Sequence, residues 1–318
     1  MLRFATVGTS WITTRFAEAV AAVPDAEVAC AYSRDGARAA AFAAAVGAPS
    51  WSSDLRALLA SDEVDAVYVA SPNSVHFAQA LQAVRAGKHV LVEKPATPTA
   101  AEFETLLGEA RATGVVVLEG MRTAYDPGVA RVRELLGTLG ALRLVSLRYC
   151  QRSSRYDSVL AGERVNIFDP ALAGGALNDL GVYCVSVLVD LFGEPARVGA
   201  ASVPVGGGAD GAGVAIASYP GFVADLGWSK ITASDVPSEV QGEAATLVVD
   251  HLPAPRHLRV RALDGSEESF RVAAPEFTLQ YEVERFAQLC AGADPSADHR
   301  RTLAVLRTLE AIRAAAAG

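Results

Sequence analysis

Hydrophobic and polar positions in roughly the first 120 residues alternate between two patterns. Short apolar runs rich in β-branched residues predict strands at residues 2–7, 26–32, 66–70, 89–93 and 115–118. Longer amphipathic or Ala-rich segments, several of them followed by glycine, predict helices at residues 13–22, 37–46, 54–60, 75–85 and 99–113. Strands that alternate with helices in this way predict βαβ units and a parallel sheet.

After about residue 122 the pattern changes to short strands separated by Gly-rich or Pro-Gly turns. Strands are predicted at residues 142–150, 198–203, 214–218, 222–230, 239–241, 246–250, 258–262 and 269–272, with residues 206–211 as a hairpin tip. Helices are predicted at residues 127–136, 175–192, 277–291 and 299–317. We therefore expect a Rossmann domain with a doubly wound parallel sheet at 1–121. An α+β domain with a large, mostly antiparallel sheet should follow at 122–318.

Composition narrows the class of protein. The chain has 318 residues, of which 51% are hydrophobic, so it can bury the cores of two domains. We find neither an uninterrupted apolar run of membrane-spanning length nor a signal-peptide pattern, and so expect a cytoplasmic protein that does not bind membranes. The net charge of −8 argues against a nucleic-acid binder. Four scattered cysteines (Cys30, Cys150, Cys184 and Cys290) predict reduced thiols and no metal site.

Two short stretches carry candidate catalytic groups. Lys94 follows Glu93 at the end of a predicted strand, and the carboxyl edge of an open α/β sheet is where ligands bind. Asp179 and Tyr183 are four residues apart on a predicted helix, so they share a face. A lysine and a tyrosine can together move a proton on and off a carbinol oxygen, because a nearby ammonium favours the phenolate.

The turn after the first strand has the position of a dinucleotide-binding fingerprint, where backbone N–H groups at a helix N-terminus meet a pyrophosphate. Gly8, Ser10, Trp11 and Ile12 are the candidate contacts there. Only the first glycine of the fingerprint is present, since Ser10 and Thr13 replace the other two. A plain tight turn would look the same, so this motif does not decide the function by itself.

The end of the second strand bears on the choice between NADP and NAD. A carboxylate at position 33 would accept hydrogen bonds from the ribose 2′-OH, whereas Ser33 does not repel a 2′-phosphate and Arg34 can pair with it. An ordinary surface arginine is the alternative interpretation of Arg34. We expect NADP as cofactor, with NAD as the alternative. Ser71, Asn73 and His76 follow another strand; Asn73 could reach the nicotinamide ribose, while a histidine such as His76 is more often structural.

Together these motifs resemble the Gfo/Idh/MocA oxidoreductase family, which includes glucose-fructose oxidoreductase and inositol dehydrogenases. The resemblance covers nearly the whole chain and rests on residues 8–12, 71–76, 87–95 and 174–183. It implies that Lys94 acts at the nicotinamide and that the Lys94–Pro95 bond is cis, as it often is in the family. Many members have a histidine where this chain has Tyr183. In this respect the chain resembles the branch that contains dimeric dihydrodiol dehydrogenase and glucose-fructose oxidoreductase, where the tyrosine is the proposed acid/base.

The resemblance and the residues together predict an NAD(P)-dependent dehydrogenase that acts on a secondary alcohol of a sugar, polyol or cyclic diol. Tyr183 would carry the proton, Lys94 would favour its phenolate, and Asp179 would orient this group or bind a substrate hydroxyl. The candidate cofactor contacts also include His76, Glu93 and Lys94. The candidate substrate contacts are Arg122, Arg155, Asn166, Phe168 and Asp179.

An alternative is a non-catalytic NAD(P)-binding regulatory protein of the same fold; the presence of both Lys94 and Tyr183 favours the enzyme. The expected partner is a small polyhydroxy molecule. We also expect a homo-oligomer, a dimer or a tetramer, because the second-domain sheet is open on one face in the family.

NADP should bind more tightly than NAD, because Ser33 and Arg34 suit a 2′-phosphate. Fluorescence titration of both cofactors tests this, first on the parent protein and then on a Ser33→Asp/Arg34→Ala variant. The variant should lose the preference for NADP. Equal affinities in the parent would contradict the prediction.

Overall fold

The computed structural model describes residues 1–317, which form two compact units. The first unit contains residues 1–122 and 275–303, and the second contains residues 123–274 and the chain from 304 onward. The predicted boundary near residue 122 lies at the first of these divisions. Residues 275–303, which we expected in the second domain, instead pack with the first unit. The assignment of cofactor binding to one domain and of substrate binding and oligomerisation to the other stays a prediction.

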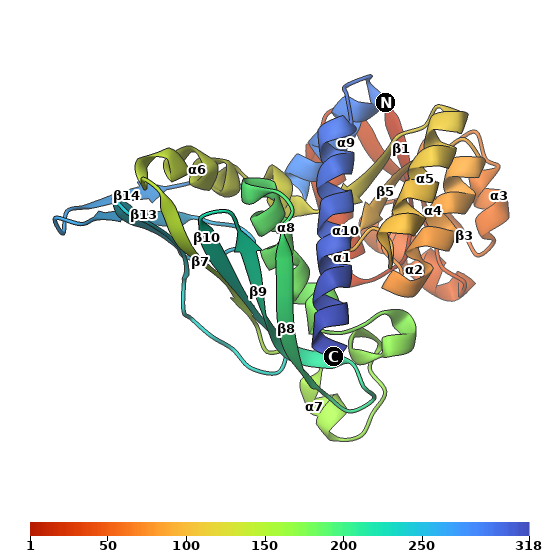
Figure 1. Ribbon diagram of the computed structural model, residues 1–318. Coiled ribbons are helices and arrows are strands. Elements are labelled where there is room, and N and C mark those ends of the chain that lie inside the picture. Colours follow the sequence, from red (N-terminus) through yellow and green to blue (C-terminus); the bar gives the residue numbers. More distant parts are fainter. Residues whose placement is uncertain (318) are drawn as a thin grey trace. The chain divides into compact units, whose positions relative to one another are not determined.

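The first unit is built on a six-stranded parallel sheet in the order β3-β2-β1-β4-β5-β6 (Figure 1). Its strands are β1 (Leu2–Val7), β2 (Ala26–Tyr32), β3 (Ser50–Ser52), β4 (Ala66–Val69), β5 (His89–Glu93) and β6 (Val117–Gly120). The short β3 was not predicted, because Ser-Trp-Ser contains no apolar run. The strand order reverses between β1 and β4, which is the topological switch point where such folds bind ligands. The predicted Rossmann sheet is confirmed.

Helices from both ends of the chain pack in this unit. They are α1 (Trp11–Ala22), α2 (Gly36–Val46), α3 (Leu55–Leu59), η1 (Asn73–Val75), α4 (His76–Arg85), α5 (Ala100–Thr113), α9 (Gln280–Cys290) and the start of α10 (Ser296–Ala317). Phe4 of β1 contacts Phe16 of α1 and Phe286 of α9, with ring centroids 5.2 and 5.6 Å away. This contact explains why residues 275–303 belong to the first unit: α9 completes its apolar core.

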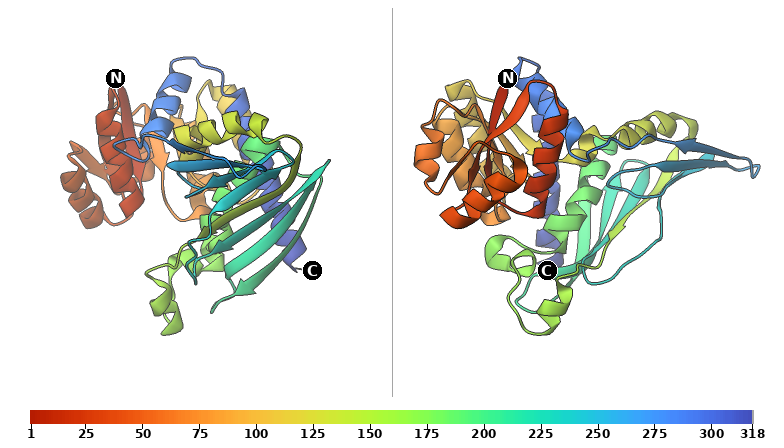
Figure 2. Two further views of the ribbon diagram at one scale, coloured as in Figure 1. Left: turned by 90° about the vertical axis from the view of Figure 1, so that its left-hand side faces the viewer. Right: turned by 180° about the vertical axis from the view of Figure 1, so that it is seen from behind.

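The second unit contains an eight-stranded sheet in the order β14-β13-β12-β11-β7-β10-β9-β8. Its strands are β7 (Leu142–Cys150), β8 (Arg197–Pro204), β9 (Asp210–Tyr219), β10 (Phe222–Ser229), β11 (Ser238–Gly242), β12 (Ala245–Val249), β13 (His257–Ala262) and β14 (Glu267–Arg271). Neighbouring strands are antiparallel except β7 and β10, so the mostly antiparallel sheet is confirmed. Figure 2 shows these strands as one twisted sheet.

Short helices connect these strands, and α8 (Val182–Phe192) lies on one face of the sheet. The others are η2 (Arg122–Tyr125), α6 (Pro127–Leu135), η3 (Leu136–Thr138), α7 (Tyr156–Leu160), η4 (Asn166–Phe168), η5 (Pro170–Leu172) and η6 (Leu177–Gly181). Among residues 1–317, the segment Pro170–Phe192 alone is long and apolar enough to cross a membrane. Because 72% of its most apolar 18-residue stretch is buried inside the protein, a core helix of this unit is a simpler interpretation than a membrane span.

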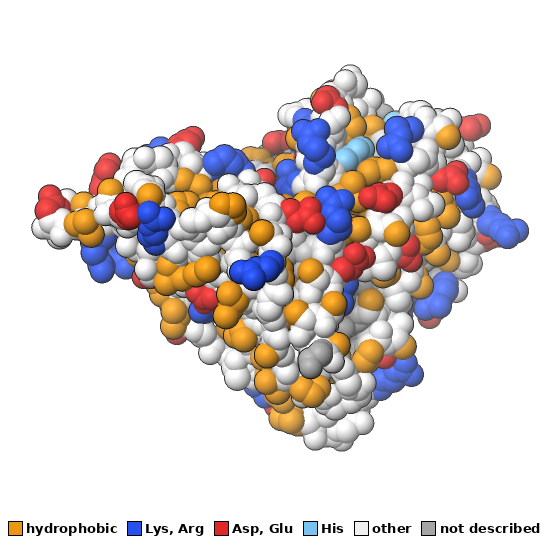
Figure 3. Space-filling view, in the orientation of Figure 1, with side chains coloured by type: hydrophobic (Ala, Val, Ile, Leu, Met, Phe, Trp, Pro, Cys, Tyr) orange, Lys and Arg blue, Asp and Glu red, His pale blue; other side chains and the backbone are white. Residues whose placement is uncertain are grey.

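The opposite face of the sheet is apolar where β8, β9 and β10 meet. Along β9, Ala215 and Ala217 are buried, whereas Val214 and Ile216, which point to the other face, are exposed. Val203 of β8 and Val223 of β10 are exposed as well. Figure 3 shows hydrophobic side chains gathered over these strands. Alternation of this kind is expected of a sheet that has its helix on one face only.

Candidate functional site

The loop after β1 approaches the loop after β4 so closely that only glycine fits at its start. Gly8 has φ +125°, and a Cβ added there would lie 2.4 Å from the carbonyl oxygen of Ala70. Helix α1 then begins at Trp11, with Ser10 as its N-cap. The Ser10 side chain makes no capping hydrogen bond, and no acidic residue lies in the first turn. The first backbone N–H groups of α1 therefore suit an anionic pyrophosphate.

The end of β2 presents a cation to solvent. Arg34 is exposed and Ser33 is half-buried. The Ser33 hydroxyl accepts a hydrogen bond from the backbone N–H of Asp35 at 3.2 Å. The Asp35 carboxylate in turn caps α2 by accepting from the Arg38 N–H at 3.1 Å. A hydroxyl and a guanidinium at this edge fit a cofactor that carries a 2′-phosphate.

His76 is fully buried and connects two loops of the first unit. Its Nδ1 lies 3.0 Å from the carbonyl oxygen of Pro95, and its Nε2 lies 2.8 Å from that of Ser71. Burial lowers the pKa of His76, and the two carbonyl groups partly oppose this effect. The Ser71 hydroxyl donates to Oε1 of Gln79 at 2.6 Å. This burial favours a structural role for His76, and its direct contact with a cofactor stays a prediction.

Lys94 lies immediately after β5, half-buried, and its peptide bond with Pro95 is cis, as the resemblance implied. The preceding Glu93 is buried. Its Oε1 accepts from the Tyr68 hydroxyl at 2.6 Å, and its Oε2 accepts from the Lys94 N–H at 3.3 Å. Burial raises the pKa of Glu93, whereas the charge of Lys94 and the bond from Tyr68 lower it. The ammonium therefore lies beside a carboxyl group at the carboxyl end of β5, the edge of the sheet where open α/β folds bind ligands.

Two further buried carboxyl groups lie near Glu93, and neither was predicted from the sequence. Glu119 of β6 accepts from the Ala96 N–H and the Thr302 hydroxyl, each at 3.0 Å. Glu282 of α9 is fully buried, and neither of its oxygens has a hydrogen-bond partner among residues 1–317. Burial raises the pKa of Glu282 well above its ordinary value; Glu93 raises it further, and Arg122 opposes the rise.

In the second unit, the predicted helix over 175–192 contains a π turn. Residues Leu177–Gly181 form η6, in which the Val182 N–H bonds the Leu177 carbonyl, and α8 follows. Single π turns within α-helices occur frequently at functional sites. Asp179 lies in this turn, and Tyr183 lies in the first turn of α8. The Tyr183 ring is buried, 5.5 Å from the ring of Tyr149 in an edge-to-face contact.

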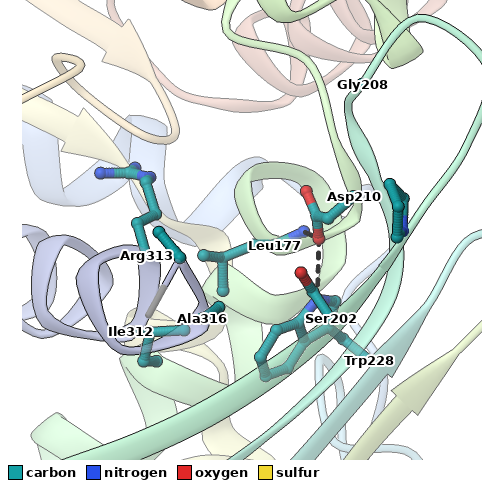
Figure 4. Close-up of a pocket in the computed structure, with 10 residues that line it drawn as sticks. Leu177, Ser202, Gly208, Asp210, Trp228, Ile312, Arg313 and Ala316 are labelled. Carbon is teal, nitrogen blue, oxygen red and sulfur yellow. Dashed lines mark hydrogen bonds between the residues drawn. The ribbon is translucent and has the colours of Figure 1, made fainter.

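Asp210, at the start of β9, supports the π turn from outside. Its Oδ2 accepts from the Leu177 N–H at 2.7 Å and from Nε1 of Trp228 at 3.0 Å (Figure 4). Gly175 has φ +133°, and a Cβ there would lie 2.2 Å from Oδ1 of Asp210, so a side chain at this position would displace the carboxylate. A cavity of 190 Å³ adjoins Leu177, Asp210 and Trp228 together with Arg313, and its lining includes none of the predicted site residues.

Lys230, directly after β10, is a charged group that the sequence interpretation missed. Its ammonium forms an ion pair with Asp179, although its side chain is only 7% exposed. It also lies 5.8 Å from the ring centroid of Phe168, which is buried. A signal was available: only three of the chain's 28 Lys and Arg residues are lysines, namely Lys88, Lys94 and Lys230. In so Arg-rich a chain, a lysine at the end of a strand suggests that a compact ammonium is needed there.

Comparison with known proteins decides the family. Residues 2–121 match an oxidoreductase family described as having an NAD-binding Rossmann fold. Residues 129–248 match the GFO/IDH/MocA C-terminal domain. The chain belongs to this oxidoreductase family.

Individual relatives are also dehydrogenases or reductases by name. The chain is 43% identical over 289 residues to a scyllo-inositol 2-dehydrogenase (NADP(+)) of Bacillus subtilis, covering 91% of this chain and 88% of that protein. It is 31% identical to a trans-1,2-dihydrobenzene-1,2-diol dehydrogenase of Bos taurus, covering 70% of this chain and 66% of the relative. A structure of a 3-ketoreductase of Actinomadura kijaniata with NADP and TDP-benzene has a TM-score of 0.89 at 26% identity. That match covers 99% of this chain and 97% of the reductase.

The predicted site residues of this oxidoreductase divide between the two units. Gly8, Ser10, Trp11, Ile12, Ser33, Arg34, Ser71, Asn73, Glu93 and Lys94 follow or end strands of the parallel sheet, and Arg122 also belongs to the first unit. Asp179, Tyr183 and Phe168 belong to the second unit, where Lys230 contacts Asp179 and Phe168. Arg155 and Asn166 are exposed. Convergence of Lys94 with Tyr183 stays a prediction.

Glu282→Gln should remove a pH-dependent loss of stability. The unfolded carboxyl ionises near its ordinary pKa of 4.5, whereas the folded one holds its proton to higher pH. The parent therefore becomes less stable relative to the variant as the pH rises above 4.5, and below that pH the difference in stability no longer changes with pH. We expect the melting temperature of the variant, relative to that of the parent, to rise by at least about 2 °C between acid and neutral pH. Glu276→Gln, at an exposed position just before α9, is the control and should show no such trend.

Proposed function

We propose that this oxidoreductase is an NADP-dependent dehydrogenase that interconverts a secondary alcohol of a cyclic polyol and the corresponding ketone. The observation that carries the proposal is the pairing of an accessible, ion-paired carboxylate, Asp179, with a phenol, Tyr183, at the start of one helix. A carboxylate accepts hydrogen bonds from hydroxyl groups, and a phenol exchanges a proton with an alcohol. The inositol and dihydrodiol dehydrogenases among the relatives support a ring-shaped substrate that carries several hydroxyls.

The residues have distinct roles in this proposal. NADP, when bound, supplies the carbon that takes up or gives up a hydride. The N-terminus of α1 and Arg34 would hold its phosphates. Tyr183 takes the proton of the reacting hydroxyl during oxidation and returns it during reduction. Lys94 donates a hydrogen bond to the same oxygen, where negative charge develops, and Asp179 accepts one from a neighbouring hydroxyl.

A regulatory protein without turnover is the competing function. It would bind NADP but would not reduce it with any member of a panel of sugars, inositols and dihydrodiols. Retention of both Lys94 and Tyr183 favours the enzyme. The same two residue types were replaced in solved variants of the Actinomadura 3-ketoreductase, one a tyrosine-to-phenylalanine change and the other a lysine-to-alanine change.

Tyr183→Phe should lower kcat by about 10²–10⁴-fold, the usual contribution of a general acid–base group, while NADP affinity stays unchanged. The parent's kcat for oxidation should rise with pH, and this dependence should disappear in the variant. Steady-state kinetics on a working polyol, with fluorescence titration of NADP, measure both effects.

Tyr149→Phe is the matched control, because its ring contacts Tyr183 but its hydroxyl donates to Gln151 at 2.9 Å. Its kcat should fall much less. In Lys94→Ala, kcat should also fall by a larger factor than the affinity for NADP does. Near-parent turnover and an unchanged pH profile in Tyr183→Phe would show that another residue carries the proton.

We further propose a cytoplasmic homo-oligomer, a dimer or a tetramer, that assembles through the open face of the eight-stranded sheet. Four exposed apolar side chains on β8, β9 and β10 (Val203, Val214, Ile216 and Val223) support this. A face of this kind gains stability when a second copy covers it. The cytoplasm is supported by four cysteines that form no disulfide among residues 1–317.

Val214→Lys/Ile216→Lys should dissociate the oligomer, because two ammonium groups would have to be buried in an apolar interface. Light scattering after size-exclusion chromatography measures the mass in solution. Leu263→Lys is the control: Leu263 is also exposed but lies in the turn between β13 and β14, away from this face. A parent mass of one chain, about 33.1 kDa, would refute the proposal.

A further inference from the structure

We propose that Lys230 is a positioning residue of the substrate site. Its ammonium holds the Asp179 carboxylate in place to accept a hydrogen bond from the hydroxyl next to the reacting carbinol. The inference rests on the proposed dehydrogenase function and narrows its substrate class: the site selects alcohols that carry a second hydroxyl on the adjacent carbon.

The backbone of Lys230 is fixed on both sides. Its N–H donates to the carbonyl of Gly211 at 2.8 Å, and its own carbonyl accepts from the Ser153 N–H at 2.8 Å. The first bond ties the end of β10 to the start of β9, next to Asp210. The second ties it to the segment that leads from β7 into α7. The ammonium is thus placed by three parts of the second unit, and a rigid support of this kind preorganises a binding group.

The side chain of Lys230 is enclosed. It is 7% exposed, with the ring of Phe168 near its ammonium and the Asp179 carboxylate as its ionic partner. Phe168 therefore contributes to the site by enclosing Lys230. Because the ammonium is buried, Lys230 acts on the substrate through Asp179. Because the Asp179 carboxylate of this ion pair is partly exposed, the pair adds little to stability. A functional reason for keeping it is therefore the simpler one.

Asp179 is held from two directions but stays accessible. The π turn that carries it is supported by Asp210, which accepts from the Leu177 N–H, while Lys230 binds the carboxylate itself. Even so, 37% of the Asp179 side chain is exposed. A carboxylate that is paired with an ammonium still accepts hydrogen bonds from hydroxyl groups. This separates two tasks: Tyr183 moves the proton, and Asp179 recognises a neighbouring hydroxyl.

This division predicts the kind of substrate. A site built to bond a substrate hydroxyl discriminates strongly against an analogue without it, because its own polar groups are then left unpaired. A vicinal polyol donates a hydrogen bond to Asp179 and presents its carbinol to Tyr183. A ring with a single hydroxyl has no second hydroxyl to donate to the Asp179 carboxylate. Lysine suits this position better than arginine, because its ammonium is more compact than the planar guanidinium group of arginine.

The test compares four proteins on one polyol and its deoxy analogue: the parent, Lys230→Met, Asp179→Asn and the double variant. A working polyol is first selected with NADP, beginning with scyllo-inositol; cyclohexanol then serves as the ring without neighbouring hydroxyls. Lys230→Met should raise KM for the polyol at least tenfold and lower kcat less. It should leave NADP affinity unchanged and reduce the preference for the polyol over cyclohexanol.

The double variant shows whether Lys230 acts through Asp179. Adding Lys230→Met to Asp179→Asn should raise KM no further, because the carboxylate that Lys230 positions is already gone. This comparison also serves if Lys230→Met alone fails to fold, since the double variant leaves no buried charge without its partner. Lys88→Met is the control: Lys88 donates to the carbonyls of Ser61 and Val64 in the first unit, and its loss should leave KM unchanged.

The outcomes are distinct. A parent that turns over no polyol refutes the proposed function and this inference with it. A parent that turns over a polyol, together with an unchanged KM in Lys230→Met, overturns the role of Lys230 alone. The same holds if Lys230→Met raises KM equally in the parent and in the Asp179→Asn background. A lowered melting temperature with unchanged KM and unchanged polyol preference would show that the ion pair is only structural.

Discussion

Charged and polar groups buried at the ends of strands need partners inside the protein, and this requirement fixes the loops of both units. Removal from water costs a carboxyl group several kcal/mol unless hydrogen bonds or an opposite charge replace the lost hydration, roughly 2–7 kcal/mol even for a neutral polar group. Glu93 finds the Tyr68 hydroxyl, Glu119 finds the Ala96 N–H, and Asp210 finds Leu177 and Trp228. Each bond joins a strand end to a different segment, so the loops that carry candidate site residues are held in place.

Glu282 is the exception, and it lies in the first unit near Glu93 and Glu119. A fully buried carboxyl group without a hydrogen-bond partner is costly, and burial raises its pKa so that it holds its proton. Groups of this kind often mark places where function is favoured over stability. The second unit differs, because its buried ammonium, that of Lys230, is paired with Asp179. The two units thus bury ionisable groups in two ways: burial favours the neutral form of Glu282, whereas the Lys230 ammonium is paired with a carboxylate.

Family membership limits the chemistry, and individual side chains limit the substrate. The relatives include inositol, xylose and dihydrodiol dehydrogenases as well as reductases of nucleotide-linked sugars, so proteins of this family differ in the substrates for which they are named. A shared fold does not select among them. In our proposal, selection comes from groups such as Asp179, Lys230 and Phe168, the last of which lies between β7 and η6.

The sequence by itself determined the parallel sheet, the mostly antiparallel second sheet and the Gly8, Lys94 and Tyr183 motifs, because these depend on local periodicity and on residues close together in the chain. Tertiary structure decided what periodicity does not encode. Helix α9 joins the first unit through Phe286 on Phe4, the helix at 175–192 begins with a π turn, and His76 is enclosed between two carbonyls. The Lys230–Asp179 pair joins residues 51 positions apart. Contacts of this kind arise only when distant segments pack together. A buried charge is stabilised by whichever partner the fold places beside it, and that partner can lie anywhere in the sequence.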